Sequence, residues 1–449
     1  MKPQKTYKSL LILTLVLVLL SGSSVAILSC YYQTPASFVV KEILRKSVLF
    51  SIAAAVQIYD PAPVVSPVFE PSPADSLDKF GELVRIEDFF EQRSPGNLKL
   101  TAVKNEKHII SQFDFNYQPF DAPDLHRLRT ENGLDSLVAA CESEFQAMVF
   151  LRNWFRQQYR RQDYQPMMEN FNAVTVLKNN IKNPENKPYT PEFYRPCHFA
   201  PLFYSQLLLS VGFQPRIVTI SFEKYYEGHG MVEVWSNQFN KWILMDPDLN
   251  LHYIKNGVPQ NTLELHEARY LENPGIEIIY PPNLYSNDES EADEKNPLKQ
   301  ELTVENMIQY HSYIRINDLR NDWMTNFYFR GHPQRSDFAQ VEWFDENIEN
   351  AFSLNPKTSN RDDYYWSLNR TEIKTPLDSN PTEKIKLIFE TFTPNFDYFQ
   401  IIINDSLSTH SKSPVFDWKL ETGKNKLRVT SVNQFGVAGV PGYLEIDRN

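Results

Sequence analysis

The sequence predicts an α+β protein: an N-terminal membrane anchor or signal, a domain that mixes helices and strands, and a C-terminal β-sandwich. An uncharged run behind three lysines predicts the first part. Apolar residues at helical spacing, followed by strand-like runs, predict the second between residues 136 and 275. Short strands separated by glycine and proline turns predict the third from residue 384 onward.

Composition limits the kinds of partner that we expect. The net charge of −11 and the absence of a basic stretch argue against nucleic acid, which needs a positive binding face. The three cysteines do not form a disulfide framework, since Cys30 falls in the targeting segment and Cys141 resembles a small buried apolar residue. No local cluster has metal-ligand spacing, so we expect neither a metal nor a cofactor.

The N-terminal residues have the pattern of an export signal. Lys2, Lys5 and Lys8 precede an uncharged run at residues 9–29, which is close to the length that spans a bilayer. A cleaved signal, an uncleaved anchor and a lipoprotein processed before Cys30 all fit this pattern. In each case we expect a membrane-anchored or secreted protein whose bulk lies outside the cytoplasm.

Composition changes along the chain suggest the segment boundaries. Residues 61–73 contain five prolines and predict an extended spacer, and residues 287–295 contain five acidic residues and predict an exposed linker. Apolar runs at residues 98–103 and 109–115 predict strands. The expected segments are residues 1–30 (signal or anchor), 31–75 (juxtamembrane segment and spacer), 76–135 (β-rich region), 136–275 (mixed domain), 276–383 (acidic linker and mixed region) and 384–449 (Ig-like β-sandwich).

Two helices are predicted in the mixed domain. Residues 142–160 carry apolar side chains at helical spacing, and residues 197–211 form an apolar run between Pro196 and Gly212, which are typical start and stop signals. Cys197 would then lie at or near a helix N-terminus. The positive end of the helix dipole stabilises a thiolate there and lowers the pKa of the thiol.

Three strand-like runs follow, at residues 216–222, 230–235 and 241–245. If the last two form a hairpin in which Trp235 opposes Trp242, then Met231 opposes Asp246, and His229 is a diagonal neighbour of Asp246 on the same face. Such neighbours lie within about 7–8 Å by Cα, which permits an imidazole–carboxylate hydrogen bond. A register slip of one residue would place the two side chains on opposite faces.

Several residues compete with this assignment. His198 adjoins Cys197 but should point roughly 100° away around the helix, which makes it a poor base for its neighbour. Asp248 shares the strand parity of Asp246 and is an alternative orienting carboxylate, and His252 follows closely. Cys197, His229 and Asp246 remain the candidate catalytic residues.

The combination resembles the transglutaminase-like superfamily, a papain-related Cys-His-Asp fold. The matching blocks are the tryptophan-bearing helix at 142–160, Cys197-His-Phe-Ala, the run ending in Arg216, Gly-His229-Gly-Met-Val-Glu-Val-Trp, and Trp-Ile-Leu-Met-Asp246-Pro. The resemblance implies a transglutaminase-like domain at residues 136–275, with Cys197 as nucleophile, His229 as base and later acid, and Asp246 holding the imidazole tautomer. Arg195 departs from the family, which usually has glycine two residues before the cysteine.

The resulting expectation is an exported cysteine enzyme, a hydrolase or acyltransferase, that acts on amide bonds of proteins or peptides, cell-envelope ones included, through a thioester. Hydrolysis is favoured over cross-linking, because transfer to an amine requires a water-excluding site that the sequence does not indicate. A non-catalytic scaffold that binds envelope polymers is the main alternative. A carbohydrate-active protein is a third, suggested by aromatic residues at Trp343 and at positions 364–366.

Overall fold

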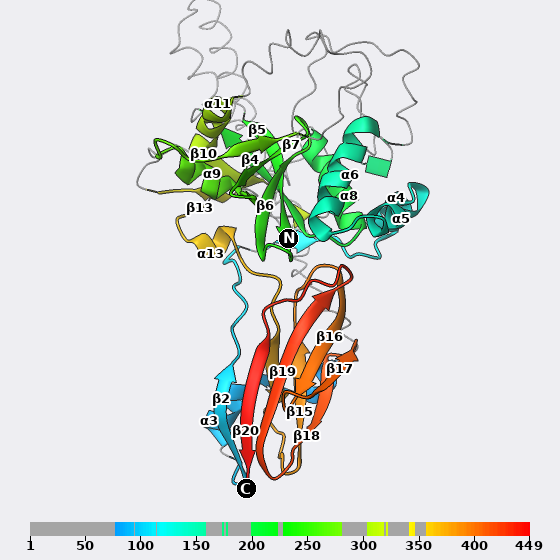
Figure 1. Ribbon diagram of the computed structural model, residues 1–449, viewed down its shortest axis with the longest axis vertical. Coiled ribbons are helices and arrows are strands. Elements are labelled where there is room, and N and C mark those ends of the chain that lie inside the picture. Colours follow the sequence, from blue (N-terminus) through cyan, green and yellow to red (C-terminus); the bar gives the residue numbers. More distant parts are fainter. Residues whose placement is uncertain are drawn as a thin grey trace, which may run out of the picture. The chain divides into compact units, whose positions relative to one another are not determined.

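The computed structural model describes residues 77–93, 95–113, 115–158, 173–174, 177, 199–222, 228–280, 303–317, 320–321, 341–345 and 356–449. These residues form a mixed α+β structure with more strands than helices (Figure 1), as the sequence predicts. Within them, no helix has both the length and the apolar character needed to cross a bilayer. The predicted anchor, the spacer, the acidic run and Cys197 lie outside these ranges.

Helices cover one face of the mixed domain: α4 (Pro123–Glu131), α5 (Leu134–Ala139), α6 (Glu144–Gln158) and α8 (Phe199–Ser210). Both predicted helices are confirmed over their described parts. Residues 200–210 of α8 are all buried, because the helix is predominantly apolar and packs against α4, α6 and the sheet. The helix stops where predicted: Gly212 has φ +84°, and a Cβ there would lie 2.2 Å from Asn395 Oδ1.

Nine of the described strands form one sheet that carries the predicted hairpin. In order they are β13 (Lys357–Thr358), β12 (Val341–Trp343), β10 (Tyr313–Asn317), β4 (Pro215–Ser221), β5 (His229–Ser236), β6 (Lys241–Asp246), β7 (Leu251–Lys255) and β8 (Val258–Pro259), with β9 (Glu277–Ile279) also paired to β7. A second core, to which α9 (Thr262–Ala268) and α11 (Val304–Gln309) contribute, covers the other face. The central strands are therefore buried on both faces.

The region at residues 276–383 supplies part of this sheet. Strand β10 pairs antiparallel with β4 over five residues, and β12 and β13 extend the sheet beyond it. Strand β10, Tyr-Ile-Arg-Ile-Asn, is only five residues long, and no local pattern specifies that it pairs with β4.

Two further sheets pack face to face through a shared core that includes Ile385, Phe399, Trp418 and Leu427. One has the order β1 (Leu83–Arg85), β14 (Glu372–Pro376), β15 (Lys384–Glu390) and β18 (Val415–Lys419). The other has the order β17 (Leu407–Ser411), β16 (Phe396–Ile403), β19 (Gly423–Asn433), β20 (Gly442–Arg448) and β2 (Leu98–Lys104). The predicted C-terminal strands are present and form a sandwich.

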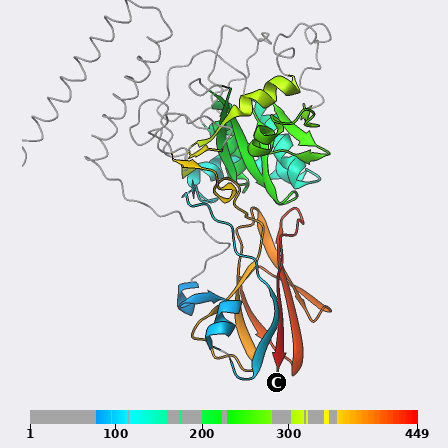
Figure 2. The ribbon, with the colours of Figure 1, turned by 90° about the vertical axis from the view of Figure 1, so that its left-hand side faces the viewer.

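The sandwich draws strands from beyond residues 384–449. Strand β2 pairs with β20, β1 pairs with β14, and helix α3 (Ile86–Arg93) contributes Ile86 to the core. Figure 2 shows this N-terminal segment, in blue, beside the orange strands of the sandwich. Residues 83–104 therefore belong to the sandwich rather than to a separate β-rich region. Such pairings between distant segments have no local sequence signal.

Two expectations from the sequence are wrong. Residues 109–113 do not form a strand; Ile110 is 71% exposed, and the chain here bonds to polar groups at Asp363 and Ser367. Cys141 is only partly buried at the edge of the helical core. The remaining elements are short: η1 (Leu77–Phe80), β3 (Asn116–Tyr117), η2 (Tyr310–Ser312), β11 (Arg320–Asn321) and α13 (Arg361–Tyr364).

Candidate active site

The structure brings His229 and Asp246 together as the strand parity predicts. Strands β5 and β6 pair with Trp235 opposite Trp242. His229 Nε2 lies 2.6 Å from Asp246 Oδ2. The His229 side chain is 16% exposed whereas that of Asp246 is fully buried. A buried carboxylate thus orients an imidazole that solvent can still reach.

The glycine before His229 permits a close approach between strands. His229 opposes Ile220 in the pairing of β4 with β5. A Cβ on Gly228 would lie 2.1 Å from the Ile220 carbonyl oxygen and 2.6 Å from Thr219 Cγ2. Because a backbone atom occupies that space, only glycine fits without moving the strand that carries His229.

Asp246 is held by its own turn. Its Oδ1 accepts hydrogen bonds from the backbone N–H groups of Asp248 at 3.0 Å and Leu249 at 2.9 Å. The second oxygen faces His229, so both oxygens have hydrogen-bonding partners. Asp248, the competing carboxylate, thus contributes a backbone amide to the support of Asp246.

Arg152 of α6 holds the turn between β6 and β7 through hydrogen bonds. The guanidinium is fully buried, and its Nη1 donates to the Leu251 carbonyl at 2.7 Å while Nε donates to Asn250 Oδ1 at 3.0 Å. Burial lowers the pKa of Arg152 to about 10, while Tyr204 and Asp246 act in the opposite direction. The group therefore stays charged at neutral pH.

Arg152 was not singled out from the sequence. It lies on the buried stripe of α6, four residues after Met148 and three before Phe155. A charged residue within an apolar helical stripe is unusual, since burial of an arginine requires hydrogen-bonding partners. The arginine within this apolar stripe was the sequence feature that could have identified Arg152 as a structurally important residue.

His252 is buried and contacts Arg152 instead of facing solvent. Its Nδ1 lies 3.2 Å from Arg152 Nη1, and the residue is 5% exposed. Burial, with the nearby Arg152, lowers the pKa of His252 to about 3, so the ring is neutral. A neutral ring can accept the Arg152 hydrogen bond at Nδ1.

Cys197, His198 and Arg195 lie outside the described residues, so the role of the thiol stays a prediction. Helix α8 is described from Phe199, two residues after Cys197 in the sequence. The Tyr204 hydroxyl donates to the Met148 carbonyl at 2.8 Å, which ties α8 to α6.

The aromatic residues that suggested carbohydrate binding belong to the core. Trp343 and Trp366 are 7% and 3% exposed, and Tyr364 is fully buried. Several of the aromatic rings surround Arg216, whose guanidinium lies 4.8 Å from the Trp366 centroid and whose Nε donates to Glu233 at 2.9 Å. An exposed stacking platform is therefore absent at these positions.

No protein-family model matches this chain, and no significant match is found among curated proteins or solved structures.

Proposed function

We propose that the protein is a transglutaminase-like cysteine enzyme that acts on amide bonds of proteins or peptides, with hydrolysis favoured over transfer. The observation that supports it most is the 2.6 Å hydrogen bond between His229 and Asp246. A histidine oriented by a buried carboxylate is the usual partner of a nucleophilic thiol. Helix α8, which follows Cys197 in the sequence, packs against β4 and against β5, the strand that begins with His229.

The hydrogen bond suggests how the proton moves. With Nε2–H donating to Asp246, Nδ1 is the ring atom that takes the proton from Cys197 Sγ. The thiolate then adds to the amide carbon, and Nδ1 returns the proton to the leaving amine as the C–N bond breaks. Water, deprotonated by His229, next attacks the thioester, which releases the carboxylic acid and restores the thiol.

Thiol labelling tests directly whether Cys197 and His229 act as a thiolate–imidazolium pair. We expect iodoacetamide to alkylate Cys197 at pH 6–7 faster than a free thiol, and at least tenfold more slowly in His229→Ala, because the thiolate loses its partner. Labelling sites are read by peptide mass spectrometry. Cys141 is the internal reference, since burial raises the pKa of its thiol.

Product analysis separates the possible activities. Incubation with denatured casein, with and without hydroxylamine, should give new carboxylates in preference to hydroxamates, and Cys197→Ala should give neither. Hydroxamates in excess would identify a transferase. Alkylation of Cys197 at the rate of a free thiol, with no turnover of casein, would overturn the catalytic proposal and favour the scaffold.

A further inference from the structure

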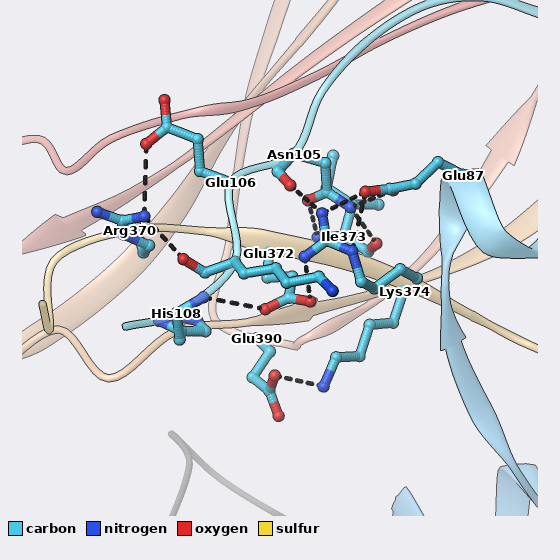
Figure 3. Close-up of polar contacts among 11 residues, drawn as sticks. Glu87, Asn105, Glu106, His108, Arg370, Glu372, Ile373, Lys374 and Glu390 are labelled. Atoms are coloured by element: carbon cyan, nitrogen blue, oxygen red, sulfur yellow. Dashed lines mark hydrogen bonds and ion pairs between the residues drawn. The ribbon is translucent and has the colours of Figure 1, made fainter. Parts of the chain in front are cut away.

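Three side chains that ligate metals in other proteins converge in the sandwich (Figure 3). They are His108, which follows β2 in the chain, Glu372 at the start of β14, and Glu390 at the end of β15. One donor atom from each lies within 4.8 Å of the other two. The residues are far apart in the sequence, which explains why a search for local ligand spacing misses them.

The two carboxylates are neighbours because of the strand pairing. Glu372 and Glu390 are directly opposite each other in the antiparallel ladder of β14 and β15. Like charges in this position destabilise a sheet, and Glu372 is only 6% exposed, so water screens the repulsion poorly. The two neighbouring carboxylates therefore require positive charge nearby to offset their repulsion.

The basic residues nearby supply only part of that charge. Arg85 Nη1 donates to Glu372 Oε1 at 2.8 Å, and Lys374 Nζ contacts Glu390 Oε2 at 2.5 Å. Arg85 also binds Glu87, so Arg85 and Lys374 face three carboxylates. Arg370 is paired with Glu106 at 3.4 Å. Two cations against three carboxylates leave these side chains with one excess negative charge.

His108 is an unsatisfied ligand group. Both of its ring nitrogens are buried and lack a hydrogen bond of standard geometry, although the ring lies beside the Glu390 backbone and packs against Phe392 at 4.5 Å. Buried polar groups without partners are rare and costly in proteins. An imidazole nitrogen without a hydrogen carries a lone pair that a metal ion can accept.

We propose that His108, Glu372 and Glu390 bind a divalent cation of the zinc type. One imidazole nitrogen with two carboxylate oxygens suits zinc better than calcium or magnesium, which prefer oxygen ligands alone. Tetrahedral zinc with bonds of about 2.0–2.2 Å requires donors about 3.5 Å apart, so the side chains must draw together slightly. The ion would fasten the chain after β2 to the β14–β15 pair, independently of the proposed catalysis.

Zinc binding to the full chain tests this site. After dialysis against chelator, titration with zinc chloride in competition with a chromogenic chelator should show one tight site, and calcium or magnesium should not compete. His108→Gln and Glu390→Gln should each weaken binding at least tenfold, because each removes one of three protein ligands. Zinc should also raise the melting temperature of the parent chain but not of His108→Gln.

Two control variants make the result specific. His126→Gln alters an exposed histidine on α4 and should leave zinc binding unchanged. Cys197→Ser removes a thiol that could itself bind zinc, and should retain the site. Equal affinity in the parent and both ligand variants, or a site lost only with Cys197, would overturn the proposal.

Discussion

Asp246 uses its two oxygens for separate tasks. Oδ1 holds the turn through two backbone N–H groups, and Oδ2 orients His229. A change that affects only the second oxygen should therefore separate chemistry from folding.

Asp246→Asn is such a change. Its side-chain oxygen can still accept the two turn hydrogen bonds, but an NH₂ group facing His229 favours the tautomer with hydrogen on Nδ1. On the proposed mechanism that nitrogen can no longer accept the thiol proton, so turnover should fall roughly 10²–10⁴-fold with little change in melting temperature. Casein hydrolysis and calorimetry check this. Loss of folding without a specific loss of turnover would contradict it.

Arg152 should contribute to the free energy of unfolding as well as to the geometry of the candidate active site. Arg152→Met removes the hydrogen bonds to Asn250 and to the Leu251 carbonyl, and leaves those buried groups unpaired. We expect a loss of about 2–4 kcal/mol in the free energy of unfolding, measured with urea. Arg156→Met, on the less buried face of the same helix, is the matched control and should cost less than about 1 kcal/mol.

At the scale of elements, the approach of β4 to β5 depends on Gly228. A Cβ at this position would overlap the Ile220 carbonyl oxygen, so Gly228→Ala must push the start of β5 away. We expect a loss of roughly 1–3 kcal/mol in unfolding free energy and displacement of His229, seen as slower alkylation of Cys197. Gly96→Ala, where no atom lies within 4 Å of a new Cβ, should leave both measurements unchanged.

Glu144 joins three elements through one buried carboxylate at the N-terminus of α6. It accepts from the Asn237 backbone N–H after β5 at 2.7 Å and from Asn433 Nδ2 of β19 at 2.9 Å. Burial raises the pKa of Glu144 from 4.5 to about 7, although these hydrogen bonds lower it. The carboxyl thus links the mixed domain to the sandwich and titrates near neutrality.

This carboxyl gives stability a defined pH dependence. Between pH 4.5 and about 7, Glu144 keeps its proton in the folded chain but has lost it in the unfolded chain. The contribution of Glu144 to the free energy of unfolding is therefore complete below pH 4.5 and is lost as the pH rises to about 7. The loss amounts to about 3 kcal/mol. Glu144→Gln should flatten the stability profile over this window; an identical slope in both proteins would contradict the assignment. Urea unfolding at several pH values measures it.

The elements also show how far the sequence could be interpreted. The hairpin of β5 and β6 was predictable because its register depends on neighbouring residues, and the contact between His229 and Asp246 followed from that register. The pairing of β10 with β4 was not, because no local pattern specifies which distant strand lies alongside. Arg152 had a local signal in the apolar stripe of α6, but no local pattern identifies its partners, which lie about a hundred residues away.

At the scale of the whole molecule, the mixed domain is inserted between strands of the sandwich. Strands β1 and β2 precede it, and β14 to β20 follow it. A chain truncated after residue 383 would leave β2 and β14 without their partners β20 and β15. We expect it to aggregate in size-exclusion chromatography, because exposed strand edges associate. A fragment of residues 105–371, without those strands, should aggregate less.

The pairing of β2 with β20 has a consequence for synthesis. Thr101 bonds to the Glu445 carbonyl across 344 residues of chain. Domains commonly fold as they leave the ribosome, in order from the N-terminus. Strand β2 therefore has no partner strand until residues 442–448 have been synthesised. We therefore expect the nascent chain to stay sensitive to protease around residues 98–104 until translation is almost complete, and to depend on chaperones that protect such strands.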